Sequence, residues 1–219
     1  METLSYVTTA LVAYLLGSVP TGFLVAQAKG IDIRSVGSGN IGATNVFRIL
    51  GKPAGVLVLL VDAVKGFLAC AVVPLLLYRL WGSPQDPAHH LREWLAITGG
   101  LAAVLGHNYT VWLWFRGGKG IATSAGVLIA LVPYALLAIL AVWIVVFALT
   151  RYVSLGSIAA SFSLPFMVWK VQRGSSTMVL ITAAMAVLAI CKHRGNIRRL
   201  LRGTEDRIQW RRNPERLTG

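Results

Sequence analysis

The sequence predicts an all-α fold, a polytopic integral membrane bundle of five to seven transmembrane helices in a single domain spanning residues 1–219. Of its 219 residues, 56% are hydrophobic and only 13% are charged, whereas soluble domains carry about 25% charged residues. Several apolar segments reach the roughly 20 residues that a helix needs to cross the hydrocarbon core. These segments fill most of the chain and leave no room for a separate soluble domain.

Six apolar segments are expected to form the helices. They cover residues 4–28, 53–78, 94–115, 121–149, 154–169 and 177–192. The first is interpreted as a helix of the mature protein, because Glu2 replaces the positive residue that precedes a signal sequence. Either Pro133 divides the fourth segment into two spans or a shorter segment is re-entrant, so the number of crossings stays open between five and seven.

The distribution of charge predicts the orientation of the bundle. Nine of the 21 Lys and Arg residues lie in the last 28 positions, which makes residues 192–219 a basic tail. Cytoplasmic segments carry an excess of Lys and Arg, so we expect a cytoplasmic C-terminus and, after an odd number of crossings, an outer N-terminus. The tail is suited to anionic lipid headgroups, and its few aromatic residues argue against nucleic acid as a partner.

Two polar, glycine-rich stretches lie between the apolar segments. Residues 36–45 read VGSGNIGATN and residues 116–126 read RGGKGIATSAG. Glycine lets the backbone approach a ligand closely, and successive N–H groups form a concavity for an anion. Two crossings separate the stretches, so both are expected on the cytoplasmic side. They predict a membrane protein that holds a phosphorylated substrate at the bilayer surface.

Neither stretch fits a soluble nucleotide-binding motif. Residues 37–42 match GxGxxG, but a membrane segment precedes them where a strand is required. The second stretch fails the Walker A pattern, because Leu113 stands where its first glycine belongs. What remains is a loop with Arg116 and Lys119 directly before a helix N-terminus, which favours an anion. The alternative is a loop that is rich in glycine only for helix packing.

Several ionisable residues lie in or beside the apolar segments. Asp62 and Lys65 are three positions apart, so a helix places them on one face. Charges at membrane depth are costly and indicate function by default, with a structural ion pair as the alternative. His107 is expected to form hydrogen bonds near a helix end, and His193 would share a helix face with Asn196. None of the four histidines begins a His-x4-Asp pattern, so a His–Asp base is unsupported.

Three motifs occur in a specific order along the chain. They are SGNIGATN at residues 38–45, GGKGIAT at 117–123 and HRGNIRRL at 193–200. Together they resemble the bacterial acyl-phosphate:glycerol-3-phosphate acyltransferase family, PlsY, and the resemblance covers nearly the whole chain. It implies transfer of a fatty acyl group from acyl-phosphate to the 1-hydroxyl of sn-glycerol 3-phosphate. The products would be lysophosphatidic acid and inorganic phosphate, in the first acylation step of phospholipid synthesis at the bacterial inner membrane.

The resemblance and the loop chemistry together indicate the site residues. Catalytic roles are expected for Ser38, Asn40, Thr44, Asn45, Arg48, Lys119, His193 and Asn196. Substrate binding is expected for Gly39, Gly42, Lys65, His107, Gly117, Gly118, Gly120 and Thr123. The two cysteines lack metal-ligand spacing, so neither a metal nor another cofactor is expected. Expected partners are the two substrates, membrane lipid and the enzyme that produces acyl-phosphate.

Acyl-phosphate is an activated mixed anhydride, and the motifs contain no convincing protein base. We therefore expect a phosphate oxygen of the donor to take the proton of the attacking hydroxyl, with His193 as base the competing hypothesis. The alternative function is a membrane transporter of a small phosphorylated solute, because transporters share multiple spans and helix-terminus anion sites. A non-catalytic membrane scaffold is a third reading.

Overall fold

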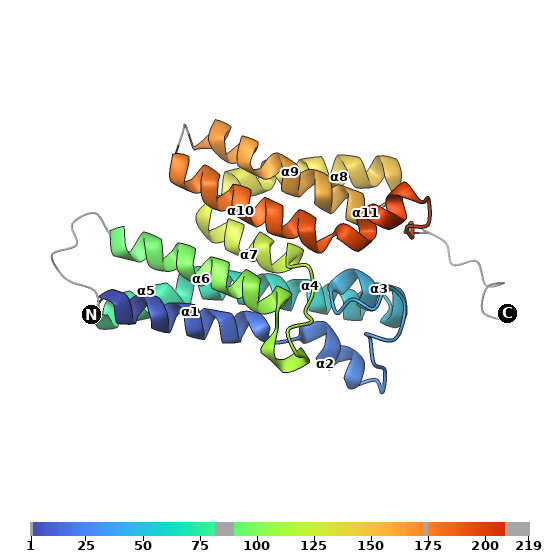
Figure 1. Ribbon diagram of the computed structural model, residues 1–219, viewed down its shortest axis with the longest axis horizontal. Coiled ribbons are helices and arrows are strands. Elements are labelled where there is room, and N and C mark those ends of the chain that lie inside the picture. The colour runs from blue at the N-terminus through green and yellow to red at the C-terminus, as the bar shows by residue number, and fades with distance from the viewer. Residues whose placement is uncertain (1, 82–89, 173–174, 209–219) are drawn as a thin grey trace. The chain divides into compact units, whose positions relative to one another are not determined.

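The computed structural model describes residues 2–81, 90–172 and 175–208, and every regular element within these ranges is a helix (Figure 1). The elements are α1 (Glu2–Ser18), α2 (Thr21–Gln27), α3 (Ala43–Leu50), α4 (Lys52–Phe67), the π-helix η1 (Leu68–Val72), α5 (Val73–Trp81), α6 (His90–Asn108), the 3-10 helix η2 (Val111–Leu113), α7 (Ile121–Leu131), α8 (Pro133–Thr150), α9 (Val153–Val171), α10 (Ser176–Lys192) and α11 (Arg194–Leu201). The all-α prediction is confirmed. Residues 209–219 of the predicted basic tail lie outside the described ranges.

Four helical stretches among the described residues are long and apolar enough to cross a membrane. They are Glu2–Gln27, Lys52–Leu80, Pro133–Thr150 and Val153–Val171. Helices α10 and α11, bent by 57° at their junction, would together make a fifth. The four or five candidate spans therefore reach only the lower limit of the predicted five to seven crossings. Helix α6 has 19 residues but is more polar and does not count among these candidates.

Proline decides where two of the apolar segments break. The first segment breaks at Val19 and Pro20, and the fourth breaks at Val132, directly before Pro133. Proline lacks an N–H group and disfavours helical backbone at the preceding residue. The fourth segment is thus broken at Pro133, but only α8 is long enough to be a candidate span, so two spans in this segment are not confirmed. Helix α7, with 11 residues, is too short to cross the hydrocarbon core alone.

The predicted third segment, residues 94–115, is not one continuous helix. Helix α6 ends at Asn108, and the aromatic residues after it lie in a turn that contains the short helix η2. Thr110 pins this turn, because its hydroxyl donates to the carbonyl of Ser18 at 2.5 Å and its own carbonyl accepts from the Phe115 N–H at 2.9 Å. Trp114 and Phe115 both have positive φ, 53° and 61°, and their side chains are exposed. These tertiary bonds, absent from any local pattern, end the helix early.

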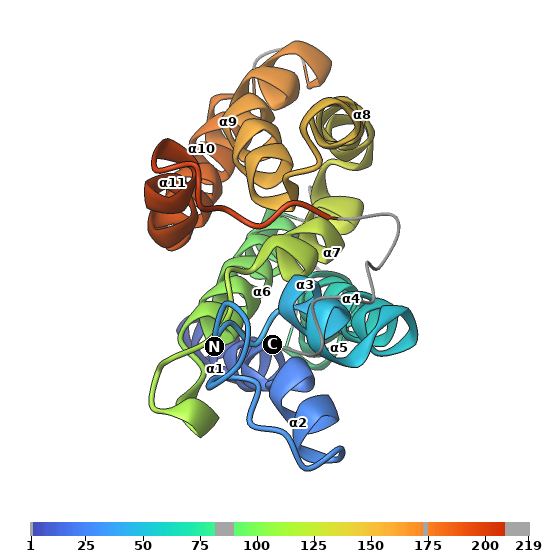
Figure 2. The same ribbon diagram turned by 90° about the vertical axis from the view of Figure 1, so that its right-hand side faces the viewer.

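The chain forms two compact units, residues 1–136 and 137–219. In the first unit, α1 lies along α6 and α4 lies along α7 (Figures 1 and 2). Both contacts depend on glycine: a Cβ on Gly17 would lie 2.2 Å from the Ala103 carbonyl oxygen, and one on Gly66 would lie 2.1 Å from that of Thr123. Small residues let membrane helices pack closely in this way. The single domain expected for residues 1–219 stays a prediction.

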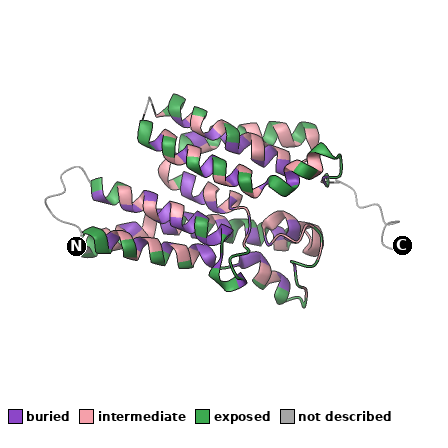
Figure 3. Ribbon diagram, in the orientation of Figure 1, coloured by how far each residue is buried: buried purple, intermediate pink, exposed green. Residues whose placement is uncertain are grey.

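The second unit is built from α9 packed against α10, with α8 beside α9. The Trp143 indole N–H donates to the Ser157 hydroxyl at 3.2 Å and joins α8 to α9. Within α8 only Ala135 and Ile139 are buried, and Figure 3 colours the ribbon by this burial. Such an apolar surface is a liability in water and is expected of a helix surrounded by lipid.

Candidate active site

The first glycine-rich loop is held by one amide side chain. Asn45 is buried in α3, and its Oδ1 accepts the backbone N–H of Ser38 at 3.0 Å. Its Nδ2 donates to the carbonyls of Ile33 at 3.2 Å and Val36 at 3.1 Å. Gly37, with φ +59°, lies so close that a Cβ there would be 2.3 Å from Oδ1 of Asn45. The shape of this loop therefore depends on Asn45 filling the space that Gly37 leaves open.

Both glycine-rich loops end at a helix N-terminus. Helix α3 begins after Gly42 and α7 begins after Gly120, and neither N-cap residue makes a side-chain hydrogen bond to its helix. The first N–H groups of a helix lack intrahelical partners and attract anions. Gly120 has φ +78°, which glycine adopts without strain. The helix predicted to begin at the second loop is thus confirmed, and both loops present backbone donors.

A hydrophobic cluster ties the two loops together. Ile41 of the first loop and Ile33, just before it, pack in one buried cluster with Leu113, which lies just before the second loop. The same cluster includes Val58 of α4. Contact between residues so far apart in sequence brings the first two motifs into one region of the first unit.

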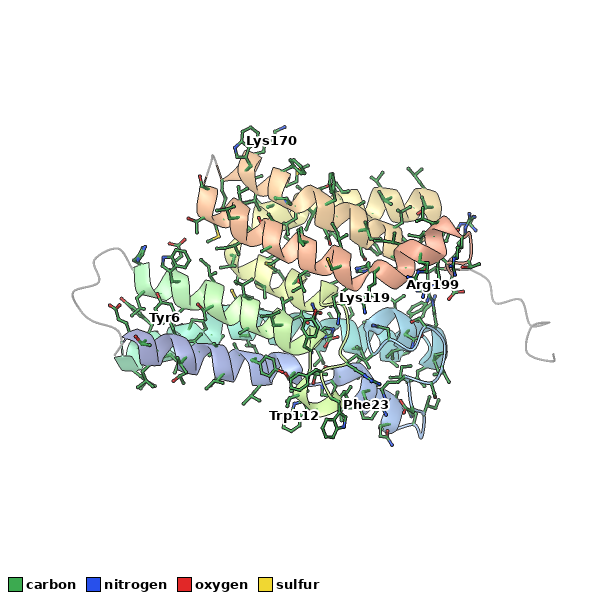
Figure 4. The ribbon with its side chains drawn as sticks, in the orientation of Figure 1. Tyr6, Phe23, Trp112, Lys119, Lys170 and Arg199 are labelled. Carbon is green, nitrogen blue, oxygen red and sulfur yellow. The ribbon has the colours of Figure 1, made fainter. Side chains whose placement is uncertain are left out.

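The second loop lies against the last turn of α6. The Gly118 N–H donates to the carbonyl of His107 at 3.0 Å, and the Gly117 N–H donates to that of Asn108 at 3.3 Å. A Cβ on Gly118 would lie 2.1 Å from Nε2 of His107, and one on Gly117 would lie 2.0 Å from the His107 carbonyl oxygen. Both positions therefore require glycine. Lys119 extends from this loop (Figure 4).

Thr123 in the first turn of α7 is fully buried. Its hydroxyl has no hydrogen-bond partner in the described part of the chain. A buried hydroxyl without a partner costs about 1–3 kcal/mol, and unsatisfied groups of this kind occur at functional sites. The role of Thr123 in substrate binding stays a prediction.

Helices α2, α4 and α6 meet at a buried charged cluster. The Lys65 Nζ lies 2.7 Å from Oδ1 of Asp62, 2.9 Å from the carbonyl oxygen of Val19 and 3.0 Å from Nδ1 of His107. The Thr21 hydroxyl donates to the same Asp62 oxygen at 3.1 Å. The ion pair expected on one face of the helix is present, and the structure surrounds Lys65 with protein acceptors.

The acidic residue nearest the first loop is occupied by a surface ion pair. Asp32 and Arg34 lie 2.7 Å apart. Hydrogen bonds from the Arg34 side chain and backbone lower the pKa of Asp32 to about 2. At neutral pH this carboxylate is ionised and paired, which makes it a poor general base.

The third motif begins in the second unit, where α10 ends and α11 starts. His193 lies at this junction, buried, with its Nδ1 2.8 Å from the carbonyl oxygen of Ala189. Asn196 is also buried, whereas Arg194 and Gly195 between them are exposed. The prediction that His193 and Asn196 share one helix face is confirmed.

A carboxylate that the sequence analysis did not single out holds the third motif. Glu205 is buried, and its Oε1 accepts from Asn196 Nδ2 at 2.6 Å and from the Ser154 hydroxyl at 2.7 Å. Its Oε2 accepts from Arg199 Nε at 2.7 Å. Burial by itself raises the pKa of Glu205, but these three hydrogen bonds outweigh it and hold the pKa below its ordinary value. The sequence feature that could have indicated Glu205 is the position of an acidic residue within a basic tail.

The predicted site residues divide between the units. The second unit holds His193 and Asn196. The first unit holds all the others, namely Ser38, Gly39, Asn40, Gly42, Thr44, Asn45, Arg48, Lys65, His107, Gly117, Gly118, Lys119, Gly120 and Thr123.

Known proteins match the chain over nearly its full length. The family model described as Glycerol-3-phosphate acyltransferase matches residues 7–203. A glycerol-3-phosphate acyltransferase of Geobacter sulfurreducens is 50% identical over 198 residues, covering 90% of this chain and 95% of its own. One of Desulforudis audaxviator is 47% identical over 213 residues, covering 97% of this chain and 100% of its own. The chain belongs to the glycerol-3-phosphate acyltransferase family.

Two solved structures agree with this assignment. Both are crystal structures of PlsY (YgiH), an integral membrane glycerol 3-phosphate acyltransferase, and both are 40% identical to this chain. The glycerol 3-phosphate form has a TM-score of 0.80 and covers 98% of this chain and 100% of its own. The lysophosphatidic acid form has a TM-score of 0.77 and covers 94% and 96%. The resemblance stated from the three motifs is confirmed, and the enzyme reading replaces the transporter and scaffold readings.

Gly118→Ala is expected to lower the kcat/KM of this acyltransferase by about a hundredfold, because displacement of a loop by about 1 Å has effects of that size. The added Cβ would meet Nε2 of His107 at 2.1 Å and push the loop away from α6. Steady-state rates and thermal unfolding of the variant test this. Gly195→Ala is the matched control, since a Cβ there meets only Arg199 Nη1 at 3.7 Å. It should retain activity and gain about 0.5–1 kcal/mol in helix stability.

Glu205→Gln is expected to destabilise the second unit by about 1.5–3 kcal/mol, the usual worth of a hydrogen bond to a charged group. Because folding lowers the pKa of Glu205, its contribution is complete at neutral pH and is lost as the pH falls through the folded-state pKa. Thermal unfolding followed from neutral pH to below about pH 4 checks this. The wild type should lose more stability on acidification than the variant, and equal losses would contradict the role.

Proposed function

We propose that this enzyme transfers a fatty acyl group from acyl-phosphate to the 1-hydroxyl of sn-glycerol 3-phosphate. The products are lysophosphatidic acid and inorganic phosphate, and the reaction is the first acylation of phospholipid synthesis. The glycerol 3-phosphate and lysophosphatidic acid forms of the similar solved structures support this acceptor and this product. The donor is inferred from the three motifs.

The observation that best supports the proposal is the pair of helix N-termini behind glycine-rich loops. Both substrates carry a phosphate group, and each uncapped N-terminus offers backbone donors to one anion. Two anions held close together repel each other, so positive groups are needed beside them. Lys119 in the second loop and Arg48 on α3 are assigned this task, and Ser38, Asn40 and Thr44 orient oxygen atoms by hydrogen bonds.

The chemistry requires orientation and charge stabilisation more than a protein nucleophile. The hydroxyl oxygen of glycerol 3-phosphate forms a bond to the acyl carbon, and the bond from that carbon to the phosphate oxygen breaks. The hydroxyl proton passes to an oxygen of the departing phosphate. Backbone donors and a lysine that are already in place stabilise the charge that develops on the leaving group.

His193 is the competing base. Its Nδ1 lies 2.8 Å from the Ala189 carbonyl oxygen, and a hydrogen bond there leaves the lone pair of a neutral ring on Nε2. His193→Ala and the pH–rate profile separate the two hypotheses. Residual turnover without a histidine-like ionisation supports proton transfer to the donor phosphate. An ionisation near pH 6.5 that vanishes in the variant would establish His193 as the base.

The orientation proposed for the enzyme places all three motifs and the C-terminus in the cytoplasm and the N-terminus outside. Bacterial relatives and the basic tail support the inner membrane as its location. Acyl-phosphate then reaches the site from the bilayer surface, with its chain among the apolar helices. The enzyme that produces acyl-phosphate is the proposed protein partner on that side.

The proposed function is tested with purified protein in detergent, supplied with glycerol 3-phosphate and either acyl-phosphate or acyl-CoA. Equimolar phosphate and lysophosphatidic acid from acyl-phosphate alone are expected. Lys119→Ala should lower kcat by about 10²–10³-fold, the range found for lost transition-state donors. Lys29→Ala, an exposed lysine outside the motifs, should retain wild-type rates. Product from acyl-CoA alone would overturn the proposed donor.

A further inference from the structure

The buried ammonium of Lys65 has three acceptors for its three hydrogens. They are Oδ1 of Asp62 at 2.7 Å, the Val19 carbonyl oxygen at 2.9 Å and Nδ1 of His107 at 3.0 Å. The side chain is 4% exposed, so water does not replace any of these partners. An ammonium group only donates hydrogen bonds. The contact with His107 therefore requires a lone pair on Nδ1.

This requirement determines the protonation of the imidazole. A neutral histidine with its lone pair on Nδ1 carries its proton on Nε2. A proton on Nδ1 would instead face the Lys65 ammonium. Oδ1 of Asp62 also lies 3.6 Å from Nδ1 of His107, but the Lys65 ammonium is the nearer partner of that nitrogen, at 3.0 Å. The geometry thus selects the Nε2–H form.

The opposite edge of the same ring lies against the second glycine-rich loop. A Cβ on Gly118 would be 2.1 Å from Nε2 of His107 and 3.0 Å from each neighbouring ring carbon. The His107 carbonyl also accepts the Gly118 N–H at 3.0 Å. One residue therefore contacts the loop through both its backbone and its ring. Nothing in this arrangement gives Lys65 itself a free hydrogen for substrate.

We propose that Lys65 acts as a positioning residue, which fixes His107 as the neutral Nε2–H tautomer, and that this ring holds the Gly117–Gly120 loop in its anion-binding conformation. Asp62 supplies the countercharge that keeps Lys65 protonated in an apolar setting. The second half of the proposal rests on the proposed function, because it assigns the loop to a phosphate group. The tautomer itself follows from contacts within the protein.

The tautomer is tested by ¹⁵N NMR of protein labelled at histidine, without substrate. A protonated ring nitrogen and one with a lone pair differ in ¹⁵N shift. His107→Gln removes the signals of one of the four histidines and so assigns those of His107 by difference. We expect a lone pair on Nδ1 and a proton on Nε2. A proton on Nδ1, or a doubly protonated ring at neutral pH, would overturn the inference.

The coupling to the loop is tested with two isosteric variants. Glutamine places its terminal amide near the position of Nε2, and asparagine places its amide near that of Nδ1. The kcat/KM of His107→Asn should be about a hundredfold lower than that of His107→Gln, as expected for a misplaced loop. Similar unfolding temperatures for the two variants would exclude a folding defect as the cause. Equal or better activity of His107→Asn would overturn the role of the ring.

The experiments distinguish a failure of the proposed function from a failure of this inference about His107. Wild-type protein that makes no lysophosphatidic acid would overturn the proposed function, whatever the histidine spectrum shows. An active wild type with its His107 proton on Nδ1 would overturn only this inference.

Discussion

Asp62→Ala is expected to destabilise the first unit by about 3–5 kcal/mol, the cost of leaving a buried charge without its partner. The Asp62 carboxylate accepts from Lys65 and Thr21, and both ionic side chains are almost fully buried. Without it, the Lys65 ammonium retains only neutral acceptors. The free energy of unfolding of detergent-solubilised protein, measured by denaturant titration, gives the size of the loss.

Two controls show whether this loss comes from the buried charge. Asp32→Ala removes the same residue type from the exposed pair with Arg34, and it should cause no measurable loss. The double variant Asp62→Leu with Lys65→Met removes both charges and should recover much of the stability, because apolar replacements of a buried pair are often neutral. A double variant as unstable as Asp62→Ala would show that the charge pair is not the cause.

Asn45→Ala is expected to lower kcat/KM by about 10²–10³-fold, because the first loop loses the side chain that determines its shape. Three hydrogen bonds to the backbone of residues 33–38 disappear together, each worth about 0.5–1.5 kcal/mol. The loop then no longer presents the Ser38 region to a phosphate group in one conformation. Initial rates at saturating and limiting glycerol 3-phosphate measure the loss in kcat and KM.

A second variant, Asn45→Asp, tests the role of the amide donors of Asn45. Aspartate keeps the acceptor for the Ser38 N–H but places a second oxygen against the carbonyls of Ile33 and Val36, where a donor is needed. It should therefore be no better than alanine. Arg34→Ala is the control, since Arg34 lies just before the same loop but is exposed and contacts Asp32 and the ring of Phe23. Near-wild-type activity of Asn45→Asp would contradict the role assigned to the amide donors.

Local features of the sequence were sufficient for the fold class and for the location of the loops. Apolar segments of spanning length predict membrane helices whatever their neighbours are, and glycine clusters predict close backbone approach. Spacing placed Asp62 and Lys65 on one face and His193 beside Asn196, and both placements are confirmed. The helix end at Asn108 was missed, because it depends on the contact of Thr110 with Ser18, 92 positions away.

By itself, then, the sequence determined an all-α membrane enzyme with three motifs, because helix length, glycine content and motif order are properties of short segments. Only the tertiary structure decided which buried polar side chains pair with one another. Asn45 forms hydrogen bonds within its own loop. Lys65 contacts His107, 42 positions away, and Glu205 accepts a hydrogen bond from Ser154, 51 positions away. Such pairings form when packing excludes water and each buried polar group must find a partner. Long-range pairings of this kind are therefore not predicted by any local pattern in a single sequence.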